Sequence, residues 1–331
     1  MRPESRHRAI LAAALAGALA IGPVPPVLAD PARWQAEFPL TDFSRASVPL
    51  HEIISGGPPR DGIPAIWDPV MVPAAGETRI PGAEPVMTLE LPGAEPRAYP
   101  VRYLMWHEIA NDVIGDIPVA VTYCPLCNSA MAFDARVDGE RLTFGVSGKL
   151  RHSDMVMYDR ETESWWQQAI GEGIVGRHTG VRLVALPAWM ESWDEFRSRN
   201  PDGLVMDEPQ WRRNYGANPY AGYDSSIRPF LYGGDLPPHD IPALARVVRV
   251  DDRAWTFERV RAAGEIVEDG VRISWTAGQV SALDSPRIAE GREVGTIRVR
   301  DAATGADLPH DVPFAFAFHA FFPDGRWMLG Q

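Results

Sequence analysis

Cys124 and Cys127 are the only cysteines in the 331-residue chain, and they lie three positions apart in the run Cys-Pro-Leu-Cys. A thiol pair at this spacing can exchange with a disulfide or can give two sulfur ligands to a soft metal ion. An inert structural disulfide is the third alternative. Closing so short a loop stabilises a fold by roughly 2 kcal/mol, against about 3 kcal/mol for a loop of fifteen residues. We therefore favour a redox or metal-binding role over a purely structural one.

The residues on either side of Cys124 predict how it is positioned. Residues 119–123 are β-branched, small or aromatic, which is typical of a buried strand, and Pro125 suits the first position of a helical turn. A cysteine at a helix N-terminus faces unpaired amides that favour the thiolate. We predict that Cys124 is a nucleophile with a lowered pKa and that Cys127 is the resolving thiol.

The segment from 149 to 176 is dense in polar residues, glycines and aromatics, a composition typical of a pocket lined by loops. A purely structural role is the alternative for each of these residues taken singly. The candidates for supporting the site, which include neighbours of this segment, are Pro125, Ser147, Gly148, His152, Ser153, Asp154, Tyr158, Asp159, Trp165 and Gln167.

A metal site is the main alternative to redox chemistry, and no cofactor is expected otherwise. Copper could be held by Cys124, Cys127, His152 and Met155, because soft sulfur ligands suit Cu(I). The single pair provides only half of a zinc site. Covalent haem attachment needs histidine directly after the second cysteine, where this chain has Asn128.

The first 29 residues have the pattern of a secretory signal peptide. Arginines at 2, 6 and 8 precede an apolar run and a small-residue site that ends at Ala29. We predict cleavage near Ala29 and a periplasmic or secreted product, in a compartment where disulfides persist. No later segment approaches the eighteen or so apolar residues of a membrane span, so we expect no transmembrane segment in the mature chain.

The charge of the chain limits its partners. The formal net charge is −12, and removal of the basic leader makes the chain more acidic still. Such a balance argues against nucleic acid or an anionic membrane as partner, since both attract basic surfaces. The expected partner is a redox protein or a small-molecule substrate that the sequence does not identify.

Composition and patterning predict an α+β fold rich in β-structure, with short strands and hairpins and a few short helices. The 31 prolines and 29 glycines are scattered, as expected for many turns. We predict an N-terminal wrapping segment over 30–83 and a main domain over 84–331. The predicted elements are hairpins over 86–102 and 132–148, helices near 103–111 and 190–199, an ordered loop over 215–224 with tyrosines above the pocket, and a core strand over 313–322.

The adjacent residues His107 and Glu108 have two interpretations. They can be a surface pair that ends the short helix, or a catalytic pair, and we favour the surface interpretation.

The main domain could consist of two related halves, because 84–205 and 243–323 share a residue pattern. Arg102, Glu108, Ile109 and Asp112 recur at Arg259, Glu265, Ile266 and Asp269, at a constant offset of 157. Ala98-Tyr99 likewise recurs as Ala254-Trp255. These matches suggest an internal duplication. The second copy has 274–278 in place of the strand that leads into the cysteines, so it would be structural.

Several motifs occur in one order between residues 97 and 160. They are Arg97-Ala-Tyr-Pro100, Trp106-His-Glu-Ile109, Asp112, Pro118-Val-Ala-Val-Thr-Tyr-Cys-Pro-Leu-Cys127, Phe144-Gly-Val-Ser-Gly148, Ser153-Asp154 and Val156-Met-Tyr-Asp-Arg160. In this order the chain resembles the prokaryotic family called domain of unknown function 3179. Some members of that family are classed as selenoproteins, with selenocysteine at a cysteine of the motif, so the resemblance implies a redox-active site. The chain departs from the family at His152, where an asparagine is expected.

These observations lead to one main functional hypothesis, an extracytoplasmic thiol–disulfide oxidoreductase or thiol peroxidase-like enzyme. The fold is not expected to be that of thioredoxin, because little room for a helix remains between Cys127 and the turn at Asp138-Gly139. The alternatives are a copper-binding protein and a secreted binding module of unknown ligand with an inert disulfide.

Overall fold

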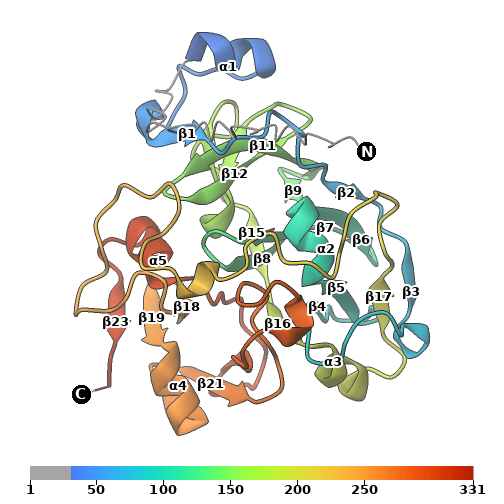
Figure 1. The fold of residues 1–331 in the computed structure, drawn as a ribbon. Coiled ribbons are helices and arrows are strands. Elements are labelled where there is room, and N and C mark those ends of the chain that lie inside the picture. Colours follow the sequence, from blue (N-terminus) through green and yellow to red (C-terminus); the bar gives the residue numbers. More distant parts are fainter. Residues whose placement is uncertain (1–30, 331) are drawn as a thin grey trace, which may run out of the picture.

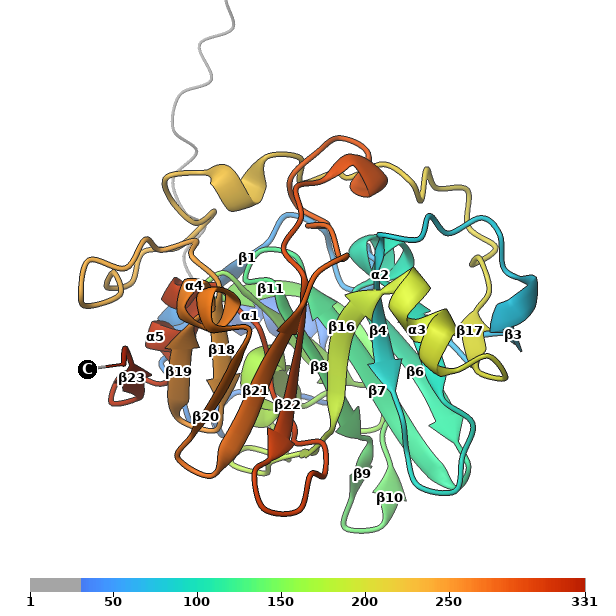
Figure 2. The same cartoon turned by 90° about the horizontal axis from the view of Figure 1, so that it is seen from below.

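The computed structural model describes residues 31–330, so the predicted signal peptide lies outside the described residues. Within this range the chain forms five sheets of three to five strands and one small two-stranded sheet. The sheets stand side by side in a propeller-like arrangement (Figure 2). The helices are α1 (Pro31–Glu37), α2 (Val101–His107), α3 (Trp193–Arg199), α4 (Phe257–Ala263) and α5 (Ala315–Phe321), each of seven residues. The prediction of a β-rich fold with few short helices is confirmed.

Most of the strands belong to three five-stranded sheets. In spatial order, the first sheet has β1 (Ile53–Ser55), β11 (Phe144–Arg151), β12 (Asp154–Asp159), β13 (Trp165–Gln167) and β14 (Glu172–Val175). The second has β15 (Val184–Leu186), β8 (Ser129–Asp134), β7 (Ile117–Cys124), β6 (Ile109–Ile114) and β2 (Ile66–Trp67). The third has β16 (Ala188–Ser192), β4 (Pro85–Leu89), β5 (Arg97–Pro100), β17 (Leu204–Met206) and β3 (Met71–Pro73). The smaller sheets are β18 (Val247–Val250), β19 (Arg253–Thr256) and β23 (Arg326–Met328), then β20 (Glu265–Glu268), β21 (Val271–Thr276) and β22 (Thr296–Asp301), and the pair β9 (Arg136–Val137) and β10 (Glu140–Arg141).

The N-terminal segment over 31–83 contributes one edge strand to each of three sheets. Strand β1 pairs with β11, β2 pairs with β6, and β3 pairs with β17. In Figure 1 this blue segment starts beside β1 and β11 at the top of the view and runs down the right-hand edge to β3. It therefore joins sheets whose other strands come from much later in the chain.

Several elements with local sequence signals are present. The predicted hairpin over 86–102 is formed by β4 and β5. The hairpin predicted over 132–148 is formed only at its tip, where β9 and β10 pair around Asp138-Gly139, because β8 and β11 belong to different sheets. The helix predicted near 103–111 begins earlier, at Val101, and ends at His107, after which β6 begins. The helix predicted near 190–199 begins at Trp193, where the Ser192 hydroxyl accepts a hydrogen bond from the amide of Glu195.

Two predictions of local structure are wrong. No helix follows Cys124, because residues 125–128 form the turn of the β7–β8 hairpin, in which Cys124 pairs with Ser129. The segment predicted as a phenylalanine-faced strand is instead helix α5. Phe316 and Ala317 are equally buried there, so the alternation of large and small residues does not mark a buried and an exposed face.

Two parts of the main domain share an order of elements. Strands β4 and β5, helix α2 and strands β6 and β7 are matched by β18, β19, α4, β20 and β21. In both parts a hairpin strand leads directly into a seven-residue helix, which leads into a second hairpin. We call these parts the first and second copies; their origin by duplication stays a prediction.

The structural correspondence of the copies differs by one residue from the predicted one. Helices α2 and α4 correspond at an offset of 156, so that Glu108 corresponds to Gly264 and not to Glu265. The amides of Glu108 and Gly264 both donate to a helix carbonyl, at 2.6 and 2.9 Å, and both backbones have a positive φ, of 59° and 73°. The four residue pairs matched at 157 are therefore not structural equivalents.

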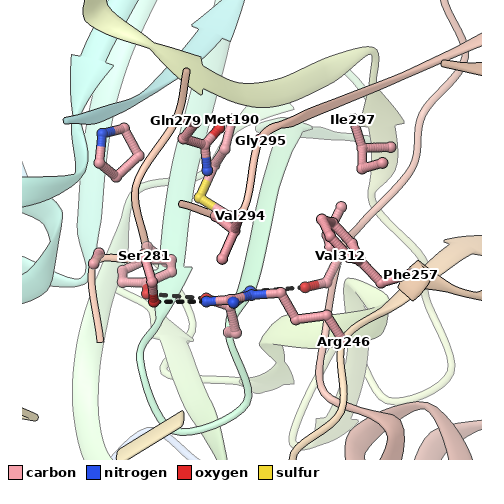
Figure 3. A pocket seen from close by; sticks show the side chains of 13 residues that line it. Met190, Arg246, Phe257, Gln279, Ser281, Val294, Gly295, Ile297 and Val312 are labelled. Carbon is pink, nitrogen blue, oxygen red and sulfur yellow. Dashed lines mark hydrogen bonds between the residues drawn. The ribbon is translucent and has the colours of Figure 1, made fainter. Parts of the chain in front are cut away.

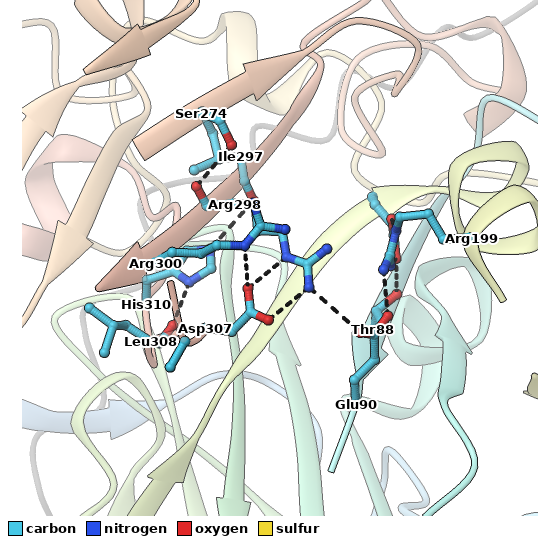
Figure 4. Close-up of polar contacts among 12 residues, drawn as sticks. Thr88, Glu90, Arg199, Ser274, Ile297, Arg298, Arg300, Asp307, Leu308 and His310 are labelled. Carbon is cyan, nitrogen blue, oxygen red and sulfur yellow. Dashed lines mark hydrogen bonds and ion pairs between the residues drawn. The ribbon is translucent and has the colours of Figure 1, made fainter. Parts of the chain in front are cut away.

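The sheets of the two copies are joined by a network of ion pairs, shown in Figure 4. Arg298 on β22 pairs with Asp307 at 2.6 Å and lies 3.6 Å from Glu90, which follows β4. Arg199 of α3 pairs with Glu90 at 2.6 Å. Because the network is partly buried and each carboxylate has more than one arginine, it fixes the two sheets against each other better than isolated surface pairs would.

Candidate functional site

Both thiols are buried at the turn of the β7–β8 hairpin. The exposed fraction is 1% for Cys124 and 0% for Cys127, and neither forms a disulfide. Asn128 closes the turn with a φ of 53°, a left-handed conformation that asparagine tolerates better than most residues. The turn therefore folds Cys127 back towards Cys124 in the interior of the protein.

A segment from the far end of the chain holds this turn in place. The amide of Phe314 donates to the carbonyl of Cys127 at 2.9 Å, and the Asn128 side-chain amide donates to the carbonyl of Val312 at 2.8 Å. The buried carboxylate of Asp311 accepts hydrogen bonds from the Ser129 hydroxyl at 2.6 Å and the Ala130 amide at 2.9 Å. These four bonds fix the thiol-bearing backbone.

Asp154, at the start of β12, completes the cluster. One ligand atom each of Cys124, Cys127 and Asp154 lie within 4.8 Å of one another. The Cys127 thiol donates to Asp154 Oδ1 at 2.9 Å. The other carboxylate oxygen accepts from Gln167 Nε2 at 2.6 Å and from the Ala169 amide at 3.0 Å. Asp154 is therefore positioned by two donors while it contacts the thiols.

The pKa values of the two thiols differ from the prediction. Burial raises the pKa of the Cys124 thiol, although a hydrogen bond with Cys127 partly offsets that effect. Burial raises the pKa of Cys127 well above its ordinary value. The predicted lowering of the Cys124 pKa is wrong, because Cys124 ends a buried strand and no helix N-terminus faces it.

Asp154 is the group best suited to accept a thiol proton. Burial raises its pKa to about 6, while hydrogen bonds from Cys127 and Gln167 act in the opposite direction. The carboxylate is thus ionised at neutral pH and already bonded to a thiol hydrogen. A neighbouring base of this kind can compensate for a thiol whose own pKa is high.

Glu108 is a residue near the cluster that the sequence interpretation placed wrongly. We expected it on the surface, but only 8% of the residue is exposed. Burial, with a further contribution from the charge of Asp154, raises the pKa of its carboxyl group to about 8. No hydrogen bond to this carboxyl group is formed by the residues from 31 to 330.

His107 is buried as well. Its ring nitrogens contact the Pro64 carbonyl at 2.7 Å and the Tyr215 hydroxyl at 2.8 Å, which indicates a structural role.

A cavity of about 400 Å³ lies beside the thiol hairpin, and Glu108, Leu126 and Met155 line it, whereas Cys124, Cys127 and Asp154 do not. Tyr220 and Tyr223 form part of its wall, as predicted for the loop over 215–224. The Tyr223 hydroxyl donates to the carbonyl of Leu126, inside the cysteine turn, at 2.8 Å. The loop is therefore attached directly to the thiol hairpin.

A second cavity, which Tyr123 lines, is far smaller. Its volume is about 20 Å³, and Arg246 and Ser281 meet in it through a hydrogen bond of 2.8 Å (Figure 3). This space is about that of one water molecule. It cannot admit a substrate.

Several of the predicted supporting residues lie at the thiols or at the cavity beside the thiol hairpin. Ser153 precedes Asp154, and its carbonyl lies 3.9 Å from the Cys124 sulfur. Pro125 is buried in the turn itself. Gly148 lines the large cavity with a φ of 74°, and a Cβ there would lie 2.1 Å from the Pro58 carbonyl oxygen, so only glycine fits. Ser147 stabilises the bulge beside it by accepting from the Lys149 amide at 3.0 Å.

Other predicted residues are placed elsewhere by the structure. The Tyr158 hydroxyl donates to Asp61 at 2.6 Å. Asp159 accepts from the indole of Trp166 at 2.8 Å. Trp165 packs against the N-terminal segment, with its ring centroid 5.1 Å from that of Trp34. These three side chains stabilise the first sheet and do not contact the thiols.

His152 lies in the two-residue turn between β11 and β12. Its Nε2 is 3.3 Å from Glu52, and it lines a different cavity together with Tyr232. The φ of 52° at this position favours asparagine, which gives a physical reason for the asparagine expected there.

The predicted copper site is not assembled as expected. In the described part of the chain the metal-capable cluster consists of Cys124, Cys127 and Asp154, without His152. Met155 lines the large cavity beside that cluster.

Comparisons with known proteins identify the chain only at the level of family. A family model described as "Protein of unknown function (DUF3179)" matches residues 60–325. Searches of curated proteins and of solved structures found no match. Over 31–330, none of the helices has the length and apolar character needed to cross a membrane.

Proposed function

The chain belongs to the DUF3179 family, and we propose that it is a thiol–disulfide redox protein in which Cys124 and Cys127 alternate between two thiols and a disulfide. The observation that carries this proposal is the hydrogen bond of 2.9 Å from the Cys127 thiol to Asp154, within a buried cluster of two sulfurs and one carboxylate. A structural thiol pair has no need of a buried carboxylate beside it, since burying that charge is costly.

The chemistry starts from the contacts of the cluster. Asp154 accepts a proton from the thiol pair, to which it is hydrogen-bonded through Cys127, and the thiolate is left on Cys124, the proposed nucleophile. The Cys124 thiolate attacks the oxidised substrate and becomes covalently attached to it. Cys127 then attacks the Cys124 sulfur and releases the reduced substrate, leaving the intramolecular disulfide.

The test uses the full mature protein with single substitutions. Cys127→Ser should trap a mixed disulfide through Cys124, and Cys124→Ser should abolish trapping. Thr276→Ser is the matched control, because Thr276 ends β21 as Cys124 ends β7. Intact-mass measurement of each variant after exposure to a small disulfide gives the result. A Cys127→Ser protein that never forms an adduct would contradict the proposal.

A copper-binding protein is the second candidate, since Cys124, Cys127 and Asp154 could together bind one soft ion. Metal analysis of the protein purified from its native compartment separates the two candidates. Stoichiometric copper that is lost in both cysteine variants would favour the metal site. Two titratable thiols without bound metal would favour the redox function.

We also propose that the protein works outside the cytoplasm, on the pattern of residues 1–29. N-terminal sequencing of the mature protein should begin at Asp30. Retention of Met1 would contradict this.

A further inference from the structure

We infer that the large cavity beside the thiol hairpin binds a small organic amine, with the Glu108 carboxylate as the partner of its ammonium group. This site is separate from the proposed redox chemistry, because neither cysteine lines the cavity. Three features of the cavity support the inference: its size and opening, its unpaired carboxyl group, and its aromatic wall.

The cavity has the size and the access of a small-molecule site. Its volume of about 400 Å³ is within the range of such sites. Its lining includes the exposed residues Pro219, Ala221 and Ser226, so it opens to solvent at the loop that carries them. A small molecule can therefore reach the cavity from outside.

Glu108 contributes an unpaired carboxyl group to this cavity. The residue is 8% exposed and lines the cavity, and with residues 31–330 its side chain forms neither a hydrogen bond nor an ion pair. Burial, with a contribution from the charge of Glu108, raises the pKa of the Tyr220 hydroxyl, which also lies at this cavity. Buried polar groups are costly unless they are hydrogen-bonded. A ligand that donates hydrogen bonds to the carboxyl group would satisfy it.

The charges of the lining favour an organic cation. Lys149 is the one basic residue among the lining residues, and its ammonium group is already paired with Glu37 at 2.5 Å. An anionic ligand would lose its hydration without gaining a free cation. A hard metal ion is disfavoured as well, because such ions take several oxygen ligands and the lining offers a single carboxyl group, that of Glu108.

The wall of the cavity suits the hydrocarbon part of an amine. It includes the aromatic residues Tyr220, Tyr223 and Phe230 and apolar residues such as Ile63. The Tyr223 hydroxyl holds this wall in place, because it donates to the Leu126 carbonyl at 2.8 Å and accepts from the Phe230 amide at 3.1 Å. Aromatic faces attract organic cations. A carboxylate for the ammonium group and an aromatic, apolar wall for the rest of the molecule together make an amine site.

The backbone at Glu108 gives further support. Its φ of 59° and ψ of −32° are unfavourable for a residue with a side chain, and the second copy has Gly264 at the equivalent position. Strain that persists at a cavity wall is a reason to infer a functional role for the residue that bears it.

The experiment compares amines with the alcohols of the same carbon skeleton. Phenethylamine and phenethyl alcohol, then hexylamine and hexanol, are titrated into the mature protein at pH 8, with both thiols reduced, in an isothermal calorimeter. We expect each amine to bind at least about 10-fold more tightly than its alcohol, as a charge-assisted hydrogen bond predicts. Glu108→Gln should remove this preference by weakening the binding of the amines. Glu265→Gln, an exposed substitution in the second copy, is the matched control and should preserve it.

Proton release is a second readout of the same site. Burial, with a contribution from Asp154, raises the pKa of Glu108 to about 8, so the free carboxyl group holds a proton at pH 7. An ammonium ligand should displace that proton, and titrations in two buffers of different ionisation enthalpy measure its release. The other titratable groups near Glu108 are Cys124, Asp154, Tyr220 and Lys149. Because Glu108→Gln leaves all four in place, loss of the proton release in this variant would assign the proton to Glu108.

A pair of tryptophan variants tests the location of the site. Ala221→Trp should fill the cavity mouth and weaken amine binding at least about 10-fold, because a large side chain takes the space of the ligand. Ala303→Trp, on an exposed turn far along the chain, should leave binding unchanged.

Three results would overturn the inference. The first is equal binding of each amine and its alcohol, and the second is no binding of either amine at millimolar concentration. The third is a Glu108→Gln protein that keeps the preference for amines while its circular dichroism spectrum matches that of the wild type.

Discussion

The two copies of the strand–helix–hairpin unit share their backbone and differ at the two positions where the first copy could do chemistry. Strand β7 ends at Cys124, and a turn over 125–128 returns the chain directly to β8. Strand β21 ends at Thr276, and residues 277–295 intervene before β22, although Thr276 pairs with Thr296 as Cys124 pairs with Ser129. The scaffold is thus common to both copies, while the tight thiol-bearing turn belongs to one.

The second difference lies at the end of the helix. Gly264 adopts its positive φ without steric cost, whereas Glu108 adopts nearly the same conformation with a side chain, at a cost of about 1 to 3 kcal/mol. A buried carboxyl group adds a further penalty whenever it ionises. The residue at the end of the helix therefore lowers stability in the first copy, and its counterpart in the second copy does not.

The largest expected effect comes from removing the Glu108 charge. The pKa of this group is raised by burial to about 8, so the native state loses stability as pH rises from about 4.5 to about 8 and regains it as pH falls. Glu108→Gln should match the wild-type free energy of unfolding near pH 4 and exceed it at pH 9 by on the order of 4 kcal/mol. Thermal or denaturant unfolding at both pH values provides the measurement.

Glu265→Gln serves as the control, because Glu265 is an exposed residue of the second copy that directly follows Gly264. It should change stability by less than about 0.5 kcal/mol at either pH. A Glu108→Gln protein with the same pH profile as wild type would show that Glu108 is not buried as described.

The next effect concerns the base of the thiol cluster. Because the pKa of Asp154 is raised to about 6, the rate of thiol oxidation in the wild type should fall as pH drops through 6. Asp154→Asn should lower the rate about 100-fold at pH 7 and abolish that dependence. Asp159→Asn is the matched control on the same strand, since Asp159 bonds to Trp166 and not to the thiols. Stopped-flow assays of thiol loss at a series of pH values provide the measurement. If the rate of Asp154→Asn still fell as pH drops through 6, Asp154 would not be the proton acceptor.

The smallest effect tests the helix ends directly. At pH 4, where Glu108 is protonated in both states, Glu108→Gly should stabilise the protein by about 1 kcal/mol, because strain is relieved. Gly264→Ala should destabilise it by about the same amount, because the positive φ then carries a Cβ. Parallel urea denaturation of the two variants compares the copies at one position. Effects of the same sign would show that the two helix ends are not equivalent.

The sequence predicts the hairpins and the tyrosine loop because the signals for them are local. Asp138-Gly139 is itself the turn, and the tyrosines at 220 and 223 lie in a loop that contains only the short 3-10 helix Tyr223–Ser225. The structure of the cysteine turn was not predictable in this way. Pro125 suits a helix start and a tight turn equally, and the bond that decides between them comes from Phe314.

The residues of the candidate site also differ in whether local sequence signals predict them. Cys124 and Cys127 are evident from their spacing, and Asp154 and Gln167 could be selected from a polar segment, but no local pattern shows that Gln167 orients Asp154. Glu108 could not be placed, because the cavity that it lines is formed with residues far along the chain, among them Tyr220. A comparison of the two copies in the correct register, with Gly264 opposite Glu108, is the sequence signal that could have found it.

The wrapping segment has a consequence for the order of folding. Ile54 pairs with Leu150 and Val72 pairs with Val205, so the strands made first must await partners made much later. Pairing across such sequence separations costs loop-closure entropy before the stabilising contacts form, and this cost slows folding. Until β1, β2 and β3 dock, three sheet edges are left with unpaired backbone groups, where another chain could add a strand. The segment that completes these sheets therefore also sets how long the nascent protein is open to aggregation.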